Sequence, residues 1–593
     1  MTSTRMAARA RATAAASAAL LAATPGHATK FELDGGIVGS LDSTYSVGLQ
    51  RRMRSPDARI FGNDSGGSVP TGTALGALVN GAGAEATANP DFNYTNIDDG
   101  DLNYKKGDIV SFVLKGTNEL FLKKPGDWAL LGRITYSTDL KANDTRRTPL
   151  DDDAKKAVQQ NFSLLDLWAS KDFKIGEQNA KLKFGNQVIS WGEDLFIVGG
   201  INSINALDLR KAHIPGTQLK EIFVPAPMLS LTSGVAEGVS MEAYYQFVWN
   251  RFILDAAGTY WSNADFLGKG GQRGAYFPSS VLGLPTNTVG DFDPTRGRTL
   301  DALSMANGGP GVIPVERQDP RRSGQFGVNL RLRPGDGDTE YALYAIHYHD
   351  KLPFVGFRYD PAIANVAAIG AVEQYGQDRN LFGLSLNTKA GEWAIGAELS
   401  YRPKDSVAID PTVPLSGPYS FFGNPGYGGS DPYLMNGWKT EKKYQAQVTG
   451  FRFLPSEWTR ALGAAEGYVM AEAAVTHYPQ LDLSGAVPYL LNNYTLPDKT
   501  SWGYVAEIGL TFANLFGSGW TMTPIVDWYH DVSGVSPNTL PFIAGRKALA
   551  MALNFDYHNT FKMGLGYSMF RGGGNLNLNR DRDVLTASMS YTF

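Results

Sequence analysis

Apolar and polar residues alternate along the last stretch of the chain. Every second residue from Leu585 to Phe593 is apolar, and the residues between them are small or polar. Successive side chains of a β-strand point to opposite faces, so this pattern predicts a strand with one apolar and one polar face. The same alternation recurs upstream, for example from Trp502 to Phe512 and from Phe561 to Met569. The chain is therefore predicted to be all-β.

The alternating segments form a long series. We predict about eighteen strands, or sixteen or twenty if one hairpin is missed or added. Most segments have about 11–15 residues, which is long enough for a tilted strand to cross the hydrocarbon layer of a membrane. The predicted strands are 36–50, 107–121, 128–140, 161–174, 180–191, 221–233, 236–254, 322–333, 339–350, 378–389, 392–402, 441–454, 467–478, 501–514, 519–531, 543–557, 560–570 and 582–593.

Two architectures produce such alternation. In a soluble sandwich the apolar face lies in a shared core, whereas in a membrane barrel it meets lipid and the polar face lines the lumen. Strand length, aromatic residues at segment ends and alternating short and long connections favour the barrel. We therefore predict a transmembrane antiparallel β-barrel with short periplasmic turns and long extracellular loops. The predicted long loops are 51–106, 141–160, 192–220, 255–321, 351–377, 403–440 and 479–500.

Composition narrows the classes of protein. The 593 residues include 67 glycines and no cysteine, with 11% aromatic and 19% charged residues. Without cysteine there is neither a disulfide framework nor a thiolate metal site. A net charge of −4 lacks the basic footprint of a general nucleic-acid-binding protein, so we expect no nucleic-acid partner. After the first 28 residues no apolar run reaches the length of a membrane helix.

Residues 1–28 resemble a secretory signal. Three arginines precede a short apolar run from Ala12 to Ala23, and Gly26-His27-Ala28 offers small residues, Gly26 and Ala28, at the −3 and −1 positions of a cleavage site. A structural helix is the alternative. We expect a cleaved signal peptide, export to the bacterial outer membrane, and one barrel over residues 29–593 whose long loops can fold into the lumen.

Several stretches resemble the domain-of-unknown-function 1302 family of Gram-negative outer-membrane proteins. This resemblance implies an outer-membrane barrel linked to uptake or export of hydrophobic compounds such as sphingoid bases, sterols and terpenes. It implies no enzymatic activity and no agreed set of binding residues. The matching runs are FGNQVISWGE (Phe184 to Glu193), PGTQLKEIFVPAPMLSL (Pro215 to Leu231), MEAYYQFVWN (Met241 to Asn250), WSNADFLG (Trp261 to Gly268) and LSLNTKAGEWAIGAELSYRP (Leu384 to Pro403).

The polar faces of the predicted strands carry charges of both signs. These residues either cross-link the wall and anchor a plug, or select solutes as charges that line a channel. The candidate lumen residues are Arg133, Glu242, Gln246, Arg331, Glu398, Arg402, Glu507 and Lys562.

Several long loops are rich in aromatic residues. Apolar side chains are usually shielded from water, so either the loops pack on one another or they form an apolar pocket that captures a ligand above the lumen. The candidate ligand-binding residues are Phe354, Phe357, Tyr419, Phe421, Phe422, Tyr427, Trp438 and Tyr489.

The corner Trp191-Gly192-Glu193 follows a predicted strand. It is interpreted as a turn with an interfacial tryptophan, or else as a point where Glu193 anchors a plug or meets an amine headgroup. The following residues 201–220 could form a short helix inside the barrel mouth, and the weaker alternative is that Arg210, Lys211 and Lys220 there face an anionic group.

Catalytic and metal-binding signals are weak. Asp98-Asp99-Gly100-Asp101 and Asp151-Asp152-Asp153 are interpreted as solvated acidic loops, since the glutamate that completes an EF-hand loop is missing. We find no nucleophile motif and expect no enzyme, cofactor or metal.

The sequence favours an outer-membrane channel or transporter for hydrophobic or amphipathic small molecules, and the alternative is a general or polar-solute porin with a charged lumen. The expected partners are outer-membrane lipids, lipopolysaccharide and a hydrophobic ligand, and a periplasmic carrier protein is a further candidate.

Overall fold

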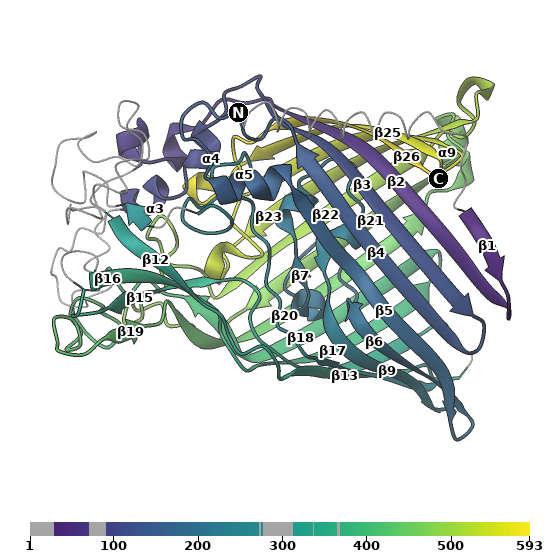
Figure 1. Ribbon diagram of the computed structural model, residues 1–593, viewed down its shortest axis with the longest axis horizontal. Coiled ribbons are helices and arrows are strands. Elements are labelled where there is room, and N and C mark those ends of the chain that lie inside the picture. Colours follow the sequence, from purple (N-terminus) through teal and green to yellow (C-terminus); the bar gives the residue numbers. More distant parts are fainter. Residues whose placement is uncertain are drawn as a thin grey trace.

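The computed structural model is a closed antiparallel β-barrel (Figure 1). It describes residues 29–69, 90–271, 274–276, 312–335, 337–363, 368–414 and 416–593, so the predicted signal peptide lies outside the described residues. The main sheet has 19 strands, and all except β1 (Thr29–Leu33) form the barrel wall. The prediction of about eighteen barrel strands is therefore confirmed.

Each barrel strand pairs with its neighbour in the chain, and the pairing of β2 with β26 closes the cylinder. The eighteen strands of the wall are β2 (Ile37–Arg52), β3 (Ile109–Lys124), β4 (Trp128–Asp139), β5 (Asn161–Ile175), β6 (Gln178–Gln187), β9 (Ala226–Ala236), β10 (Val239–Gln246), β13 (Gln325–Leu332), β14 (Glu340–Tyr348), β17 (Arg379–Ala390), β18 (Trp393–Ala408), β20 (Trp438–Phe453), β21 (Glu466–His477), β22 (Thr500–Thr511), β23 (Trp520–Ser533), β24 (Lys547–Tyr557), β25 (Phe561–Arg571) and β26 (Val584–Thr592).

The two faces of the wall differ in polarity. Large apolar side chains such as Leu565, Ile508 and Leu343 are exposed on the outer face. Their strand neighbours on the inner face include buried polar residues such as Gln325 and Glu398. A continuous apolar outer surface of this kind is suited to hydrocarbon rather than to water. The alternation in the sequence thus corresponds to a lipid-facing exterior and a polar interior.

The two ends of the barrel differ in the length of their connections. One end, the short-turn end, carries hairpin turns such as Pro125–Asp127 and His558–Thr560, whereas the other, the long-loop end, carries the long loops. Three connections at the short-turn end, β13–β14, β20–β21 and β22–β23, are longer than such a turn, and the β20–β21 connection holds α9 (Ser456–Ala461). At the short-turn end, β1 pairs with residues 37–41 of β2. The rest of the same edge of β2, residues 44–52, pairs with β26.

The long loops contain further elements. A separate sheet at the long-loop end pairs β11 (Gly274–Tyr276), β12 (Val312–Gln318), β16 (Ile369–Gln374), β15 (Phe354–Tyr359) and β19 (Tyr433–Met435) (Figure 1). Among the described residues, no helix has the length and apolar character needed to pass through a bilayer. The other short elements are η1 (Ala58–Ile60), η2 (Asn63–Ser65), α3 (Asp91–Thr95), α4 (Asp99–Leu102), α5 (Asp152–Gln159), η3 (Ile201–Ile204), β7 (Ala206–Leu207), α6 (Leu209–Ala212), α7 (Leu219–Ile222), β8 (Phe223–Val224), η5 (Leu515–Gly517), η6 (Pro537–Thr539) and η7 (Gly574–Leu576).

Several predicted strand ends are wrong. The predicted strand 392–402, for example, continues to Ala408 in β18. Three other ends lie beside one inward-folded region. The predicted strand 180–191 ends at Gln187, and the predicted strand 221–233 begins at Ala226, because the chain between them leaves the wall. The predicted strand 236–254 ends at Gln246. Beyond it, the Trp249 indole donates a hydrogen bond to the Asp350 carbonyl at 3.1 Å, so Trp249 is not part of the outward apolar face.

Candidate functional site

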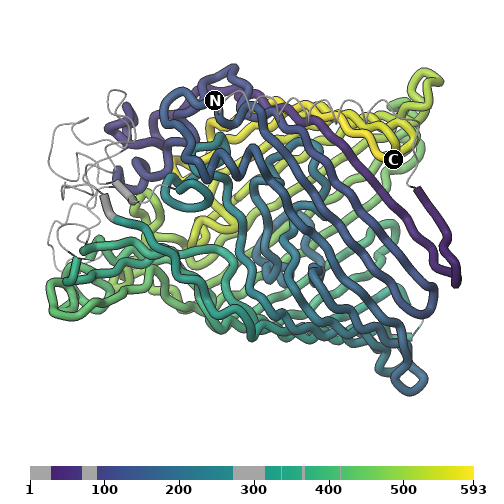
Figure 2. The backbone as a smooth tube through the Cα atoms, viewed as in Figure 1, coloured from purple at the N-terminus to yellow at the C-terminus, as the bar shows by residue number. Residues whose placement is uncertain are grey.

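Residues 188–225, between β6 and β9, leave the wall and pass through the interior of the barrel; we call them the crossing segment. The backbone path can be followed in Figure 2. The segment begins with a turn at Gly192, whose φ of +97° is the left-handed conformation that glycine adopts readily. A Cβ atom there would come within 2.6 Å of a Glu398 carboxylate oxygen. Glycine thus allows the chain to approach the opposite wall.

Trp191 lies inside the barrel. Its side chain is only 2% exposed, and its indole nitrogen donates a hydrogen bond to the Glu242 carboxylate at 2.7 Å. The ring packs edge-on against Tyr244, with centroids 5.2 Å apart, and lies 5.8 Å from the ring of Tyr344. The interpretation of Trp191 as an interfacial residue is therefore wrong, because its polar edge finds the half-buried Glu242 carboxylate in the lumen.

The corner after Trp191 is held by Glu398 on β18. One Glu398 oxygen accepts the backbone N–H of Glu193 at 2.7 Å, and the other accepts that of Ile201 at 2.8 Å. The Glu193 side chain accepts a hydrogen bond from the Asn387 amide at 2.9 Å. One carboxylate thus closes the loop 193–201 at both of its ends.

The tip of the same loop is held by Glu472 on β21. One of its oxygens accepts the backbone N–H groups of Leu195 at 3.0 Å, Phe196 at 2.5 Å and Ile197 at 3.4 Å. Hydrogen bonds to an ionised acceptor are stronger than neutral ones. Arg402 on β18 donates to the Gly200 carbonyl at 2.7 Å, which adds a cationic contact.

The other half of the crossing segment is attached to β3. The Lys115 ammonium lies 2.6 Å from the Glu221 carboxylate, and both side chains are buried. Thr117 donates a second, short hydrogen bond to Glu221. Strands β2 and β3 lie about half-way around the barrel from β18 and β21. The segment therefore spans the lumen between opposite walls.

Three apolar side chains of the crossing segment are exposed to solvent. Leu195 is 56% exposed, Val198 is 48% exposed and Leu219 is 68% exposed. The backbones of Leu195 and Val198 are held by the inward side chains of Glu472 and Gln445. Leu219 lies in α7, which the Glu221–Lys115 pair attaches to β3. The crossing segment thus combines a hydrogen-bonded backbone with exposed apolar side chains inside the barrel.

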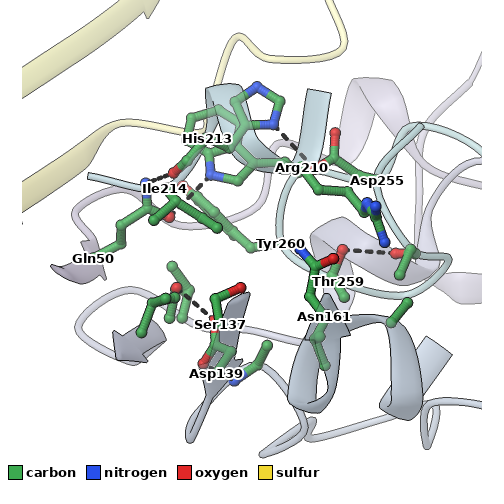
Figure 3. Close-up of a pocket in the computed structure, with 18 residues that line it drawn as sticks. Gln50, Ser137, Asp139, Asn161, Arg210, His213, Ile214, Asp255, Thr259 and Tyr260 are labelled. Atoms are coloured by element: carbon green, nitrogen blue, oxygen red, sulfur yellow. Dashed lines mark hydrogen bonds and ion pairs between the residues drawn. The ribbon is translucent and has the colours of Figure 1, made fainter. Parts of the chain in front are cut away.

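A cavity of about 70 Å³ lies beside the crossing segment (Figure 3). Inward residues at the long-loop ends of the strands, such as Gln50, Ser137 and Asp139, form one side. The crossing segment contributes His213, and the Gln50 amide donates to the His213 carbonyl at 2.5 Å. The residues 255–261 form the remaining side. A solute entering from the long-loop end would meet this cavity before the tethered part of the segment.

The remaining candidate lumen residues also lie on the inner face, where most pair with other side chains. Arg133 contacts Glu119 and Asp166, each at 2.6 Å. Arg331 lies 2.7 Å from Glu340. Glu507 accepts a hydrogen bond from Tyr468 at 2.6 Å, and Lys562 lies 3.1 Å from Asp556. The Gln246 amide donates to the Val248 carbonyl and to Asn250.

The candidate loop aromatics gather in two groups at the long-loop end. Phe357 and Phe421 are buried together with ring centroids 5.8 Å apart, and Tyr427 and Phe422 pack against Phe421. Tyr489 is buried in a second cluster, against which Tyr419 packs. This arrangement is loop-on-loop packing, the first of the two alternatives. The other candidates lie close by, with Phe354 on β15 and Trp438 at the start of β20 under the Arg379 guanidinium.

The basic residues of the crossing segment are already paired within the protein. Arg210 binds Asp208 through two nitrogens at 3.1 and 3.0 Å, and the Lys211 ammonium is 3.9 Å from Asp208. Lys220 is 3.1 Å from Glu119. The short helix expected in 201–220 is present as α6.

The acidic loop around Asp98 is not solvated. Asp98, Asp99 and Asp101 are buried, and Arg52 binds Asp101 at 2.6 Å and lies 3.4 Å from Asp581. Burial raises the pKa of Asp581 to about 7, as does the Asp101 carboxylate, while Arg52 and Arg582 oppose the shift. The expectation of a solvated loop is wrong here because arginines compensate the buried charges. Asp151 instead caps the exposed helix α5.

Sequence reasoning missed His213, Trp261 and Lys115. His213 and Trp261 stack on each other, and Lys115 meets Glu221, because the long loops fold inward. Trp261 lies in one of the family-like runs, and that was the single signal available for it. Within the described residues, no three histidine, cysteine or carboxylate side chains are gathered to hold a metal ion.

Comparison with known proteins gives one sequence match. A family described as a protein of unknown function, DUF1302, matches residues 9–593. No curated protein matches the chain.

Solved structures with a similar arrangement are all distant in sequence. OpdK of Pseudomonas aeruginosa, determined with vanillate, is 10% identical over 93% of this chain and 98% of its own, with a TM-score of 0.36. A BenF-like porin of Pseudomonas fluorescens Pf-5 is 10% identical over 95% of this chain and 100% of its own, with a TM-score of 0.37. OccAB3 of Acinetobacter baumannii is 8% identical over 94% of this chain and 99% of its own, with a TM-score of 0.39.

Proposed function

The chain belongs to the family of unknown function DUF1302, and from this premise we propose that it is an outer-membrane channel or transporter for hydrophobic or amphipathic small molecules. The expected solutes are lipid-like compounds of the sphingoid, sterol or terpene type. The protein would reach the outer membrane through a cleaved signal peptide and carry out no catalysis. Its expected partners are the surrounding lipids and lipopolysaccharide, with a periplasmic carrier as a further candidate.

The observation that carries this proposal is the apolar surface of the crossing segment. Leu195, Val198 and Leu219 expose apolar side chains in the interior of the barrel. Each exposed apolar Å² costs about 25 cal/mol in water, and a passing apolar solute recovers this cost by covering the surface. A pore for ions or sugars would instead be expected to present polar groups at its narrowest point.

The proposed path begins at the long-loop end. A solute enters the cavity beside His213, passes the exposed side chains of the crossing segment, and leaves through the short-turn end. The hydrogen bonds to Glu398, Glu472 and Lys115 keep the segment in place while the solute passes, so only a small displacement of its apolar side chains is required.

Uptake by cells tests the proposal. A strain without the gene is complemented with the wild type, with Leu195→Ser/Val198→Ser/Leu219→Ser, or with Leu462→Ser as a matched control. Leu462 is also highly exposed but lies beside α9 at the short-turn end. We expect the triple variant to lose uptake of labelled hydrophobic compounds by about tenfold, the factor that corresponds to about 1.4 kcal/mol. Unchanged uptake of every such compound in the deletion strain would refute the function.

The paired charges of the inner wall favour a second candidate, a polar-solute porin. Arg133, Glu119 and Asp166 form one such group on β3, β4 and β5. Planar-bilayer recordings separate the two candidates. A steady, large ionic conductance supports the porin, whereas near silence together with hydrophobic uptake supports the transporter.

A further inference from the structure

The charged groups around the cavity of Figure 3 are all engaged by protein partners. The His213 Nδ1 atom lies 3.0 Å from the Asp255 carboxylate. Arg210 is bound to Asp208 through two nitrogens. Asp139 accepts hydrogen bonds from the Ser111 hydroxyl at 2.6 Å and from three backbone N–H groups, at residues 112, 141 and 142. All of the donors to Asp139 are neutral, so its negative charge is not compensated by a cation, whereas Arg210 is already paired with Asp208. Among the described residues that line the cavity, no lysine or arginine is left to neutralise a carboxylate ligand.

Neutral polar groups, by contrast, retain hydrogen-bonding capacity. The Ser137 hydroxyl has no hydrogen-bond partner among the described residues, although it lines the cavity. The Asn161 amide nitrogen is also available, because the side chain of Asn161 makes one long contact, 3.4 Å, through its oxygen. On His213, Nε2 remains open, since Nδ1 is the atom that faces Asp255. Together these groups can both donate to and accept from a hydroxyl or a carbonyl.

The rest of the cavity wall is apolar and fixed. The Trp261 ring stacks on His213, with centroids 4.6 Å apart and planes inclined by 14°. The Trp261 nitrogen donates to the Gln50 side chain at 3.1 Å, which fixes the orientation of the indole. Val110 and Ile214 line the cavity as well. An apolar wall with a few convergent polar groups is the usual form of a small-molecule site.

From this pattern we propose that the cavity binds the uncharged polar end, a hydroxyl or keto group, of an amphipathic molecule and discriminates against carboxylates. A carboxylate transferred to this site would lose its hydration and lie beside the carboxylates of Asp139 and Asp255, whereas a hydroxyl exchanges its water partners for Ser137, Asn161 and His213. The inference rests on the proposed function, because it names the headgroup chemistry of the solute that this path would carry.

The size of the cavity limits how much of the ligand it encloses. A volume of about 70 Å³ exceeds the roughly 30 Å³ that one water molecule occupies in the liquid, but it is far below the volume of a lipid. The polar end and the first few carbons therefore occupy the cavity, and the remaining apolar body extends toward the crossing segment.

Binding to the full-length protein in nanodiscs tests this specificity. Two probes share one ring and differ in their polar group: cyclohexanol and cyclohexanecarboxylate, each titrated at pH 7.5 by calorimetry against empty nanodiscs. We expect cyclohexanol to bind at least about tenfold more tightly than the carboxylate, which is the factor for about 1.4 kcal/mol.

Two variants link this preference to the cavity. Ser137→Ala/Asn161→Leu removes the free neutral groups and should weaken cyclohexanol binding about tenfold, the scale of one or two hydrogen bonds. Val113→Phe fills the cavity from β3 and should abolish binding of both probes. Heat-modifiable migration in gels verifies that both variants are folded barrels. Equal binding by wild type and both variants, which indicates partition into lipid, overturns the inference, as does tighter binding of the carboxylate.

These outcomes are distinguishable from failure of the proposed function. Selective alcohol binding in nanodiscs together with unchanged cellular uptake after gene deletion would refute transport and leave the site standing. Protein-dependent hydrophobic uptake without alcohol preference would refute the site and leave transport standing.

Discussion

Lys115 and Glu221 form a buried ion pair, 2.6 Å between charged atoms, that joins β3 to the crossing segment. Glu221 also accepts the backbone N–H of Gln218 at 2.9 Å, so the same carboxylate caps the short helix α7 and attaches it to the wall. Such a pair adds little net stability compared with apolar packing, but it is costly to break from one side. The ion pair therefore fixes the position of the crossing segment rather than adding to the overall stability of the protein.

Replacing Lys115 with Met leaves the Glu221 carboxylate buried without its cation, a loss of about 3–5 kcal/mol for that local contact. We expect residues 214–222 to detach from β3 and planar-bilayer recordings to show larger or more frequent conductance steps. Lys562→Met is the control, since Lys562 faces inward but contacts Asp556 rather than the crossing segment. Identical recordings for both variants would contradict the tethering role.

Glu398→Ala and Glu472→Ala should loosen the loop 193–201. Each substitution removes the acceptor of at least two backbone N–H groups, and an unsatisfied buried donor costs about 1–3 kcal/mol. Hydrogen-exchange mass spectrometry of the folded barrel should show faster exchange of amides 193–201 in both variants. Glu340→Ala, which removes only a partner of Arg331 and Arg333, should leave this exchange unchanged.

The orientation of the barrel wall can be tested with paired arginine substitutions on β25. Leu565 is 53% exposed on the outer face, so Leu565→Arg places a charge against hydrocarbon and should cost about 2–4 kcal/mol near the membrane midplane. Ser568 faces the interior, and Ser568→Arg should be tolerated. Urea unfolding in lipid vesicles provides the comparison, and equal destabilisation by both would show that the faces are assigned incorrectly.

Acidity should affect the loops at the long-loop end through Asp581. Its pKa in the folded protein, about 7, is above the ordinary value of 3.8, so the folded state binds a proton more readily than the unfolded state. The stability contributed by this group is complete below pH 3.8 and is lost as the pH rises through about 7. We expect backbone amides in 572–583 to exchange faster at pH 8.5 than at pH 5.5, after correction for the intrinsic exchange rates. In Asp581→Asn, which cannot titrate at this position, the difference between the two rates should be smaller.

The wall of the barrel could be predicted almost completely from the sequence, because alternation with a period of two is a local signal. The predicted strand 128–140, for example, corresponds to β4 at Trp128–Asp139. Errors occurred where a tertiary partner competes with the wall. Trp191 ends the predicted strand 180–191, yet it lies inside the barrel, where Glu242 offers its indole an acceptor.

The interior could be predicted only in part. Alternation places Glu398 and Arg402 on the inner face, but it gives no information about which backbone they hold across the lumen. The partners of Glu398 lie about 200 residues away in the chain, at Glu193 and Ile201. Similarly, the burial of Asp101 depends on Arg52 at the end of β2 and on Arg582 in the loop before β26.

The closure of the cylinder has a consequence for biogenesis. All wall pairings except one join consecutive strands, and the exception pairs Thr44 with Thr592 and Arg52 with Val584 at opposite ends of the chain. Hairpins can therefore accumulate in order, but the final ring bonds depend on the most distant residues and carry the largest loop-closure entropy. Until the carboxyl terminus arrives, the exposed edge of β2 is a template for misassembly. The nascent molecule is then most in need of a chaperone during the interval before its last strand is delivered.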